Sequence, residues 1–258
     1  MPEALKKALS IPEQINFIKS LPVIIDNEST ANKFLRNISL CHLKAYWLAA
    51  PRNNKYFSEI IKLYEFDRRL KLLFLDALAD IELSIRTAWI YALTDSRQNY
   101  DALSYCENQN LYQNPERWQK LRQDMKEAYD KNSKRLPYMQ KYRTASARPP
   151  IWKMAELISF GLLSRLIAEL NHKTPIAKNY YLEDYNFITI LHLIVKICNI
   201  CSHHEPLWNY KDKKYPKLNK SNRAAILKES LPDAKNCVDL YTISCFCVFL
   251  LNNIDSAQ

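Results

Sequence analysis

The stretch of sequence that decides the fold is residues 57–93, FSEIIKLYEFDRRLKLLFLDALADIELSIRTAWIYAL. Apolar side chains recur through it at helical spacing, and neither glycine nor proline interrupts it. The apolar positions include Leu63, Phe66, Leu70, Leu73, Phe74, Ala77, Leu78, Ile81, Ile85 and Trp89. This pattern predicts one or two long helices.

The glycine content extends that prediction to the whole chain. The 258 residues include one glycine, Gly161. Sheet-rich folds and phosphate-binding loops both depend on glycine, because it adopts positive φ at little cost. The sequence therefore predicts an all-α fold whose helices are joined by turns rich in proline, asparagine and aspartate. It excludes Walker and dinucleotide-binding loops.

Further helices are expected on both sides of the long segment. Ser10 is a candidate N-cap, with Pro12 and Glu13 in the first turn. Other helices are expected from residue 28, and over residues 115–132, 152–170, 187–202, 224–231 and 235–253. No linker divides the chain cleanly, so residues 1–258 are expected to form a single helical domain with an N-terminal helical extension over about residues 1–55.

Charge and cysteine usage indicate the partner and the compartment. The formal net charge is +10, which favours a polyanionic partner such as nucleic acid, although a merely basic protein would have the same charge. Most of the seven cysteines lie in apolar runs, and the N-terminus lacks the apolar core of a signal peptide. We therefore expect reduced thiols, a cytoplasmic location and no membrane partner. The apolar run at residues 237–254 contains Asp239 and is short for a membrane span, so it predicts a buried or interface-forming helix.

Residues 196–209, KICNICSHHEPLWN, place polar groups where the chain otherwise predicts a buried helix. Lys196, Asn199 and His203 stand at positions i, i+3 and i+7, so at about 100° per residue they are expected to share one helix face. An amine, an amide and an imidazole together can hold a phosphate and move a proton beside it. The alternative is that His203 is a core histidine bonded to a neighbouring helix. The adjacent His204 favours the functional interpretation.

The same motif resembles a metal cluster, because Cys198, Cys201, His203 and His204 lie close together in sequence. On a continuous helix these four side chains would point in different directions and could not close on one ion. The sequence therefore predicts no metal site and no cofactor.

Three charged residues elsewhere are candidates for supporting the motif. Glu82 and Arg86 are four residues apart, so they form either an ordinary i,i+4 ion pair or a buried brace for the histidine helix. Glu156 is a carboxylate on an otherwise apolar helix and needs a partner.

Six blocks of sequence, in order, resemble the Abi family of bacterial abortive-infection proteins (the AbiD/AbiF-like group). They are residues 10–15 (SIPEQI), 35–47 (LRNISLCHLKAYW), 64–73 (YEFDRRLKLL), 81–87 (IELSIRT), 150–164 (PIWKMAELISFGLLS) and 199–209 (NICSHHEPLWN). The family is assigned to the HEPN superfamily of helical ribonucleases. The resemblance implies a HEPN-like helical bundle with additional N- and C-terminal helices.

The resemblance also implies an activity and partners. Family members look like phage-defence toxins that cut RNA without a metal ion, and two protomers commonly form one site, so a homodimer is expected. Some are encoded beside a structured small RNA that restrains them, which adds a cognate RNA to the target RNA as an expected partner. In such a site His203 would act as general acid/base for attack by the ribose 2′-hydroxyl, with Asn199 and a cation stabilising the phosphorane.

The chain departs from the family pattern at Cys198, where the family carries arginine. A thiol cannot replace a guanidinium on a phosphate. Lys196, seven residues before His203, is the candidate replacement. The alternative is a catalytically decayed HEPN-like module that binds or senses RNA without cutting it.

Two basic tracts that contain tyrosines are candidate RNA-binding surfaces, since lysine and arginine meet phosphates and tyrosine stacks on bases. Their cations are Lys134, Arg135, Lys141, Arg143 and Arg148 in the first tract, and Lys211, Lys213, Lys214 and Lys217 in the second. Solvated loops would show the same composition. A third possibility is a purely protein-binding role through the apolar C-terminal helix.

Overall fold

The protein is all-α, as predicted. The computed structural model describes residues 8–49, 55–95, 100–142, 148–213, 216–218, 227, 231 and 237–255. Within them, the strands are two residues long and the rest of the ordered backbone is mostly helical. The strands pair as β1 with β2, in parallel, and β3 with β4, antiparallel with Lys211 opposite Asp239.

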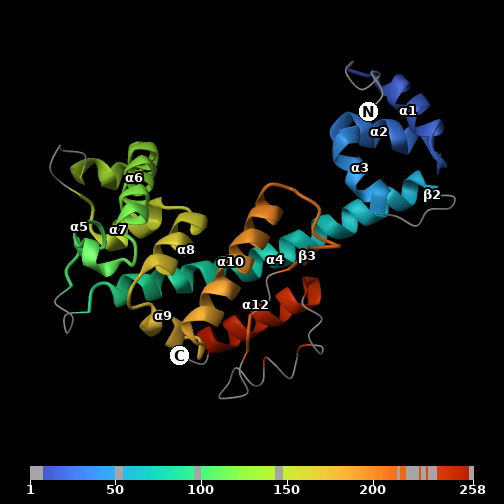
Figure 1. Ribbon diagram of the computed structural model, residues 1–258. Helices are drawn as coiled ribbons and strands as arrows, with labels where there is room; N and C mark the ends of the chain where they lie inside the picture. Colours follow the sequence, from blue (N-terminus) through green and yellow to red (C-terminus); the bar gives the residue numbers. More distant parts are fainter. Residues whose placement is uncertain are drawn as a thin grey trace. The chain divides into compact units, whose positions relative to one another are not determined.

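The elements run along the chain as follows (Figure 1). They are α1 (Ile11–Lys19), β1 (Val23–Ile24), α2 (Glu28–Asn37), α3 (Leu40–Ala49), β2 (Lys55–Tyr56), α4 (Phe57–Ala92), α5 (Ser104–Glu107), η3 (Gln109–Leu111), α6 (Pro115–Asn132), η4 (Ser133–Arg135), η5 (Pro137–Tyr142), α7 (Ile151–Leu157), α8 (Phe160–Glu169), α9 (Thr174–Lys178), α10 (Asp184–Ser202), β3 (Lys211–Asp212), β4 (Val238–Asp239) and α12 (Leu240–Asp255).

The chain divides into two compact units, and α4 contributes to both. The first unit consists of residues 1–73 and 203–208, and the second of residues 74–202 and 209–258. The boundary therefore lies inside α4 and again directly after α10. The expected single domain, with an extension over about residues 1–55, stays a prediction.

The first unit is a small helical cluster closed by a short segment from far along the chain. Helix α1 begins at the predicted N-cap, Ser10, and the structure adds a capping box, in which Ser10 and Glu13 bond each other's backbone amides. Buried residues of α1, α2 and α3 meet the first turns of α4, and Trp208 packs against this core.

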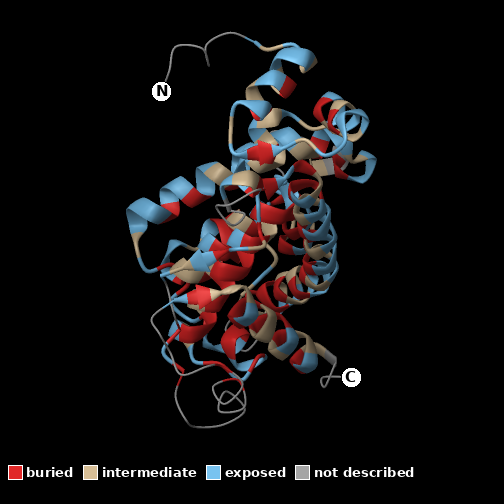
Figure 2. Cartoon of the chain, turned by 90° about the vertical axis from the view of Figure 1, so that its right-hand side faces the viewer, coloured by how far each residue is buried: buried red, intermediate tan, exposed pale blue. Residues whose placement is uncertain are grey.

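Helix α4 is a single helix of 36 residues, which resolves the choice between one and two. Its buried face includes Phe74, Leu78, Ile81 and Ile85, whereas Phe66 is 56% exposed and Leu73 is 70% exposed. The apolar pattern was therefore right about the helix and wrong about those two positions, because it contained more apolar residues than one helix face can bury. Figure 2 shows buried residues concentrated where helices pack and exposed residues on their outer faces.

In the second unit, α8 packs against both α6 and α10, and α12 packs against α10. The predicted helix over residues 152–170 is wrong as one element, because it is broken between α7 and α8. Ser159 lies at the break in extended conformation, and its hydroxyl caps α8 by accepting from the Leu162 amide. The structure adds a short helix, α9, between α8 and α10.

The C-terminal apolar run forms α12, whose inner face is buried through Ile243, Phe246, Cys247 and Leu250. Among the described residues, one helix, α10, is long and apolar enough to cross a membrane. More than half of its apolar window is buried inside the protein, as in the core helix of a globular domain. The helix expected over residues 224–231 lies almost entirely outside the described residues.

Candidate functional site

The two motif histidines lie in a turn directly after α10. The helix ends at Ser202, so His203 and His204 are not helical. His204 has a φ of 60°, in the left-handed region that non-glycine residues seldom adopt. The expected face shared by Lys196, Asn199 and His203 therefore does not extend to His203, because that geometry required a helix that has already ended. Both imidazoles are exposed, so His203 is not a core histidine.

A buried ion pair on α4 lies beneath this turn. Asp67 and Lys71 are one helical turn apart, and their charged groups are 3.0 Å from each other. The side chain of Asp67 is 0% exposed and that of Lys71 is 5% exposed. A buried ion pair is tolerated only when further hydrogen bonds satisfy both groups.

The Asp67 carboxylate meets that requirement by binding the backbone of the segment that follows the histidines. The amide of Trp208 donates to its Oδ1 over 2.7 Å, and the amide of Leu207 donates over 3.1 Å. On the other side, the Tyr46 hydroxyl donates to Oδ2 over 2.7 Å. One carboxylate thus joins α3, α4 and residues 207–208.

The Lys71 ammonium completes the arrangement by binding two carbonyls of the same segment. It donates to the Glu205 oxygen over 3.2 Å and to the His204 oxygen over 3.5 Å. The backbone from residue 204 to residue 208 is therefore held at both ends by one ion pair, while the two imidazoles remain in solvent. We call Asp67, Lys71 and Tyr46 the loop anchor.

A third imidazole, His42, lies near the loop anchor. Its ring contacts those of Tyr46 and Tyr64, with centroids 6.0 and 5.8 Å away. Burial lowers the pKa of His42, electrostatic interactions with Lys71 and His204 lower it further, and Asp67 opposes them. His42 is therefore held mainly in its neutral form near neutral pH. Sequence reasoning did not select His42 as a candidate, because no second histidine stands beside it.

Lys196 and Asn199 both lie exposed on α10. The Lys196 ammonium is 2.6 Å from Oδ2 of Asp212 in β3, and the Tyr210 hydroxyl donates to the same oxygen over 3.0 Å. Hence the charge proposed to replace the family's arginine already faces a carboxylate. Its predicted role on phosphate remains a prediction.

Glu82 and Arg86 form the i,i+4 ion pair, partly buried, on α4. Arg86 also donates to the Ala155 carbonyl and so ties α4 to α7. Burial, and then the charge of Glu82, raise the pKa of the Cys198 thiol on α10, whereas Arg86 opposes them. The pair therefore lies close to the position where the family carries arginine, and the thiol there is neutral.

Glu156 has partners, but at the surface. The Lys153 ammonium is 2.9 Å from Oε1 and the Tyr138 hydroxyl donates to Oε2. Burial alone would raise the pKa of Glu156, but these two bonds outweigh it and hold the pKa below its ordinary value. The Glu156 side chain is 45% exposed, so the partners that the sequence led us to expect lie at the surface.

The basic tracts are only partly described. Lys134 and Arg135 are exposed in η4, and Lys211, Lys213 and Lys217 are exposed in the second tract. Arg148 is exposed too, and its guanidinium donates to the Cys106 carbonyl over 3.3 Å. Lys141 lies in η5. Arg143, Lys214 and the side chain of Lys141 lie outside the described part of the chain. In that part, no group of three or more His, Cys, Asp or Glu side chains is arranged to hold a metal ion.

The fold and this site together define an all-α protein that presents an exposed histidine turn on a buried ion pair. A family model described as Abi-like protein matches residues 33–209, more than half of the chain, and the chain belongs to this family. The match includes the loop anchor and the histidine turn, confirms the family resemblance and supports a role in abortive infection, that is, in phage resistance. No curated protein and no solved structure matches the chain significantly.

Proposed function

We propose that this abortive-infection protein binds RNA and cleaves it as a metal-independent endoribonuclease of the HEPN type. The observation that carries the proposal is the clamped backbone of residues 204–208, which fixes the turn while leaving both imidazoles exposed. A side chain that transfers protons must be reachable by substrate and held on a rigid support. The turn satisfies both conditions.

The proposed step is an internal transfer at phosphorus. The ribose 2′-oxygen forms a bond to phosphorus while its proton passes to a base, and the bond from phosphorus to the 5′-oxygen breaks as an acid protonates that oxygen. His203 carries one of these proton transfers, and the neighbouring His204 is the candidate for the other. The products are a 2′,3′-cyclic phosphate and a 5′-hydroxyl. Asn199 and a cation would stabilise the charge on the phosphorane.

The experiment is an RNA cleavage assay in EDTA that compares the wild type with His203→Ala. His172→Ala is the matched control, because His172 is also an exposed imidazole but lies outside the motif. We expect His203→Ala to lose about a hundredfold or more in rate and His172→Ala to retain activity. Equal rates for the wild type and His203→Ala would refute the role of His203.

The role of Lys196 can be separated from its ion pair. If its ammonium acts on phosphate, Lys196→Ala lowers cleavage whereas Asp212→Asn, which releases the ammonium, leaves cleavage unchanged or raises it. If the pair only ties α10 to β3, the two variants have the same effect on both stability and cleavage.

A second candidate function, an RNA-binding or sensor module without nuclease activity, is favoured by Cys198. Its thiol is neutral where the family carries a guanidinium. Cys198→Arg tests this candidate, because the new cation would meet Glu82. Cleavage that appears only in Cys198→Arg identifies a decayed site, and cleavage already present in the wild type rejects the second candidate. The expected homodimer, cognate small RNA and cytoplasmic location remain predictions.

A further inference from the structure

A cavity of about 390 Å³ lies in the second unit, among α5, α6, α7 and the segment before α7. Its size falls within the range of small-molecule sites. None of its lining residues belongs to the histidine motif or to the loop anchor. The proton transfers proposed for cleavage therefore do not involve the cavity.

Hydrogen bonds between its walls form the cavity in advance. The Tyr105 hydroxyl donates to the Pro149 carbonyl over 2.8 Å, and the Arg148 guanidinium donates to the Cys106 carbonyl over 3.3 Å. The amide of Ile151 donates to Ala102 over 2.9 Å. These bonds hold α5 against the chain that enters α7, so a ligand need not organise the walls when it binds.

The charge of the lining is positive. Arg122 and Lys126 are exposed one turn apart on α6, and Arg148 also lines the cavity. Neither Arg122 nor Lys126 forms an ion pair within the described part of the chain. The described lining includes no carboxylate. The nearby Glu127 is not a lining residue, and its carboxylate accepts a hydrogen bond from Gln123, which is one. Such a lining fits an anion.

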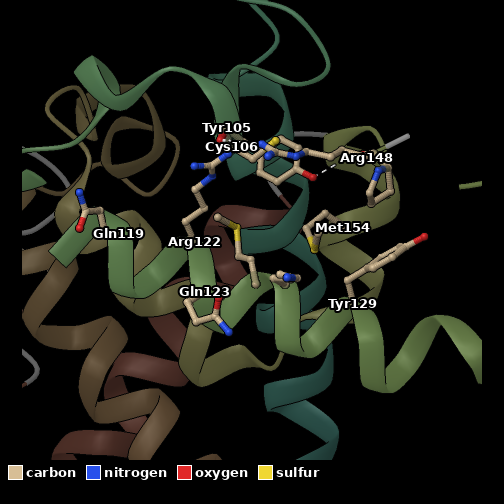
Figure 3. A pocket seen from close by; sticks show the side chains of 11 residues that line it. Tyr105, Cys106, Gln119, Arg122, Gln123, Tyr129, Arg148 and Met154 are labelled. Atoms are coloured by element: carbon tan, nitrogen blue, oxygen red, sulfur yellow. Dashed lines mark hydrogen bonds between the residues drawn. The ribbon is translucent and has the colours of Figure 1, made fainter. Parts of the chain in front are cut away.

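The rest of the lining is apolar and suits a flat ring. Met125 and Met154 are buried, and the ring of Tyr129 contributes another wall. Thioethers and aromatic rings pack well against aromatic ligands. Burial raises the pKa of the Cys106 thiol, so this group stays neutral and does not repel an anion. Figure 3 shows the Arg122 side chain extending from α6 toward Tyr105 and Cys106.

We propose that this cavity binds a nucleoside monophosphate. The base packs against the methionines and Tyr129, and the phosphate binds Arg122 and Lys126. The same chemistry has two sources, a free mononucleotide or the phosphorylated end of an RNA strand. Only the second source involves the proposed function, so loss of RNA cleavage would leave this site intact.

The test is isothermal titration of the full-length protein with the four 5′-monophosphates, with the matched nucleosides and with inorganic phosphate. We expect at least one monophosphate to bind at least about tenfold more tightly than its nucleoside or phosphate alone. Arg122→Gln should weaken that binding about tenfold. Lys120→Gln is the matched control, since Lys120 is an exposed cation of α6 outside the cavity.

Competition identifies the source. If an RNA decamer displaces the mononucleotide only when the RNA carries a terminal phosphate, the site binds a strand end. If the RNA does not displace the mononucleotide, the site binds the free mononucleotide. The proposal is overturned if no monophosphate binds at millimolar concentration, or if Arg122→Gln and Lys120→Gln weaken binding equally.

Discussion

Asp67 is the residue on which the histidine turn depends most. Its carboxylate is fully buried and accepts from Tyr46, from Lys71 and from the amides of Leu207 and Trp208. Removing it would leave a buried ammonium without its counter-charge and two buried amides without an acceptor. Each of those changes is costly in a low-dielectric interior.

We therefore predict that Asp67→Ala lowers the free energy of unfolding by about 3–5 kcal/mol, as for other buried pairs that lose one partner. Urea unfolding measures it. Asp76→Ala is the control, because Asp76 is exposed on the same helix and its removal should leave stability nearly unchanged. A destabilisation by Asp67→Ala as small as that of the control would show that the loop anchor does not hold the turn.

His42 gives a pH dependence with a defined sign. Its pKa in the folded protein lies below the ordinary value of 6.5. The unfolded chain therefore binds more protons than the folded protein as the pH falls through 6.5, and stability falls with it. We predict that unfolding free energy drops between pH ~7.5 and ~5.5, and that the drop is smaller in His42→Gln. An equal drop in His42→Gln and wild type would assign the effect to other groups.

The positions of Asp67 and Lys71 in the sequence indicate that they are buried, although their charges alone would suggest exposed residues. The buried stripe of α4 passes through Phe74, Leu78, Ile81 and Ile85 at alternating spacings of three and four. Extended toward the N-terminus, the same spacing passes through Lys71 and Asp67. Two opposite charges on an apolar stripe predict a buried pair. Their partners, the amides of residues 207 and 208, could not be predicted, because nothing local relates them to α4.

At the scale of elements, helix ends were predicted well where a side chain caps them. Ser10 and Asn114 cap α1 and α6 close to the expected starts. The break between α7 and α8 was missed because the apolar pattern continues across it, and a capping serine inside such a pattern resembles an ordinary helical residue. The end of α10 at Ser202 agrees with the predicted helix over residues 187–202. His203 was misplaced because the face that it was expected to share required the helix to continue past that end.

The Ser159 cap yields a prediction for α8. Ser159→Ala removes the acceptor for the Leu162 amide and should lower the free energy of unfolding by about 1 kcal/mol. Ser159→Asn, which keeps a capping acceptor, should be much less destabilising. If Ser159→Ala is as stable as the wild type in thermal or urea unfolding, the hydroxyl does not cap α8.

At the scale of the whole molecule, the net charge of +10 is the property that bears on an RNA partner. If the second basic tract binds phosphates, neutralising Lys211 and Lys213 together should reduce the salt dependence of RNA binding. The slope of log K against log salt should fall by about 0.7 for each single-strand phosphate that the protein no longer neutralises. Filter binding at several salt concentrations measures the slope.

The control for this prediction removes the same charge elsewhere. Lys33 and Arg36 are exposed on α2, outside both tracts, and their joint replacement by glutamine should leave the slope unchanged. If both double variants lowered the slope equally, RNA binding would depend on the net charge of the protein, with no specific contribution from the second tract.

At this scale, the prediction of the all-α class succeeded. It used signals that do not depend on distant contacts, namely the scarcity of glycine in the whole chain and the helical spacing of apolar residues. The division of the chain into units was not predictable in the same way. It depends on residues 203–208 returning to the first unit, where segments more than 130 residues apart are bonded to each other. The cavity that we propose to bind a nucleotide was also beyond sequence reasoning, since its lining is drawn from separate segments.

The most direct test of the proposed activity is the chemistry of the RNA ends. RNA incubated with the wild-type protein in EDTA should carry 2′,3′-cyclic phosphate and 5′-hydroxyl ends, and these should be absent with His203→Ala. Ends of the 3′-hydroxyl and 5′-phosphate type, or the same cyclic ends from His203→Ala, would contradict proton transfer by His203.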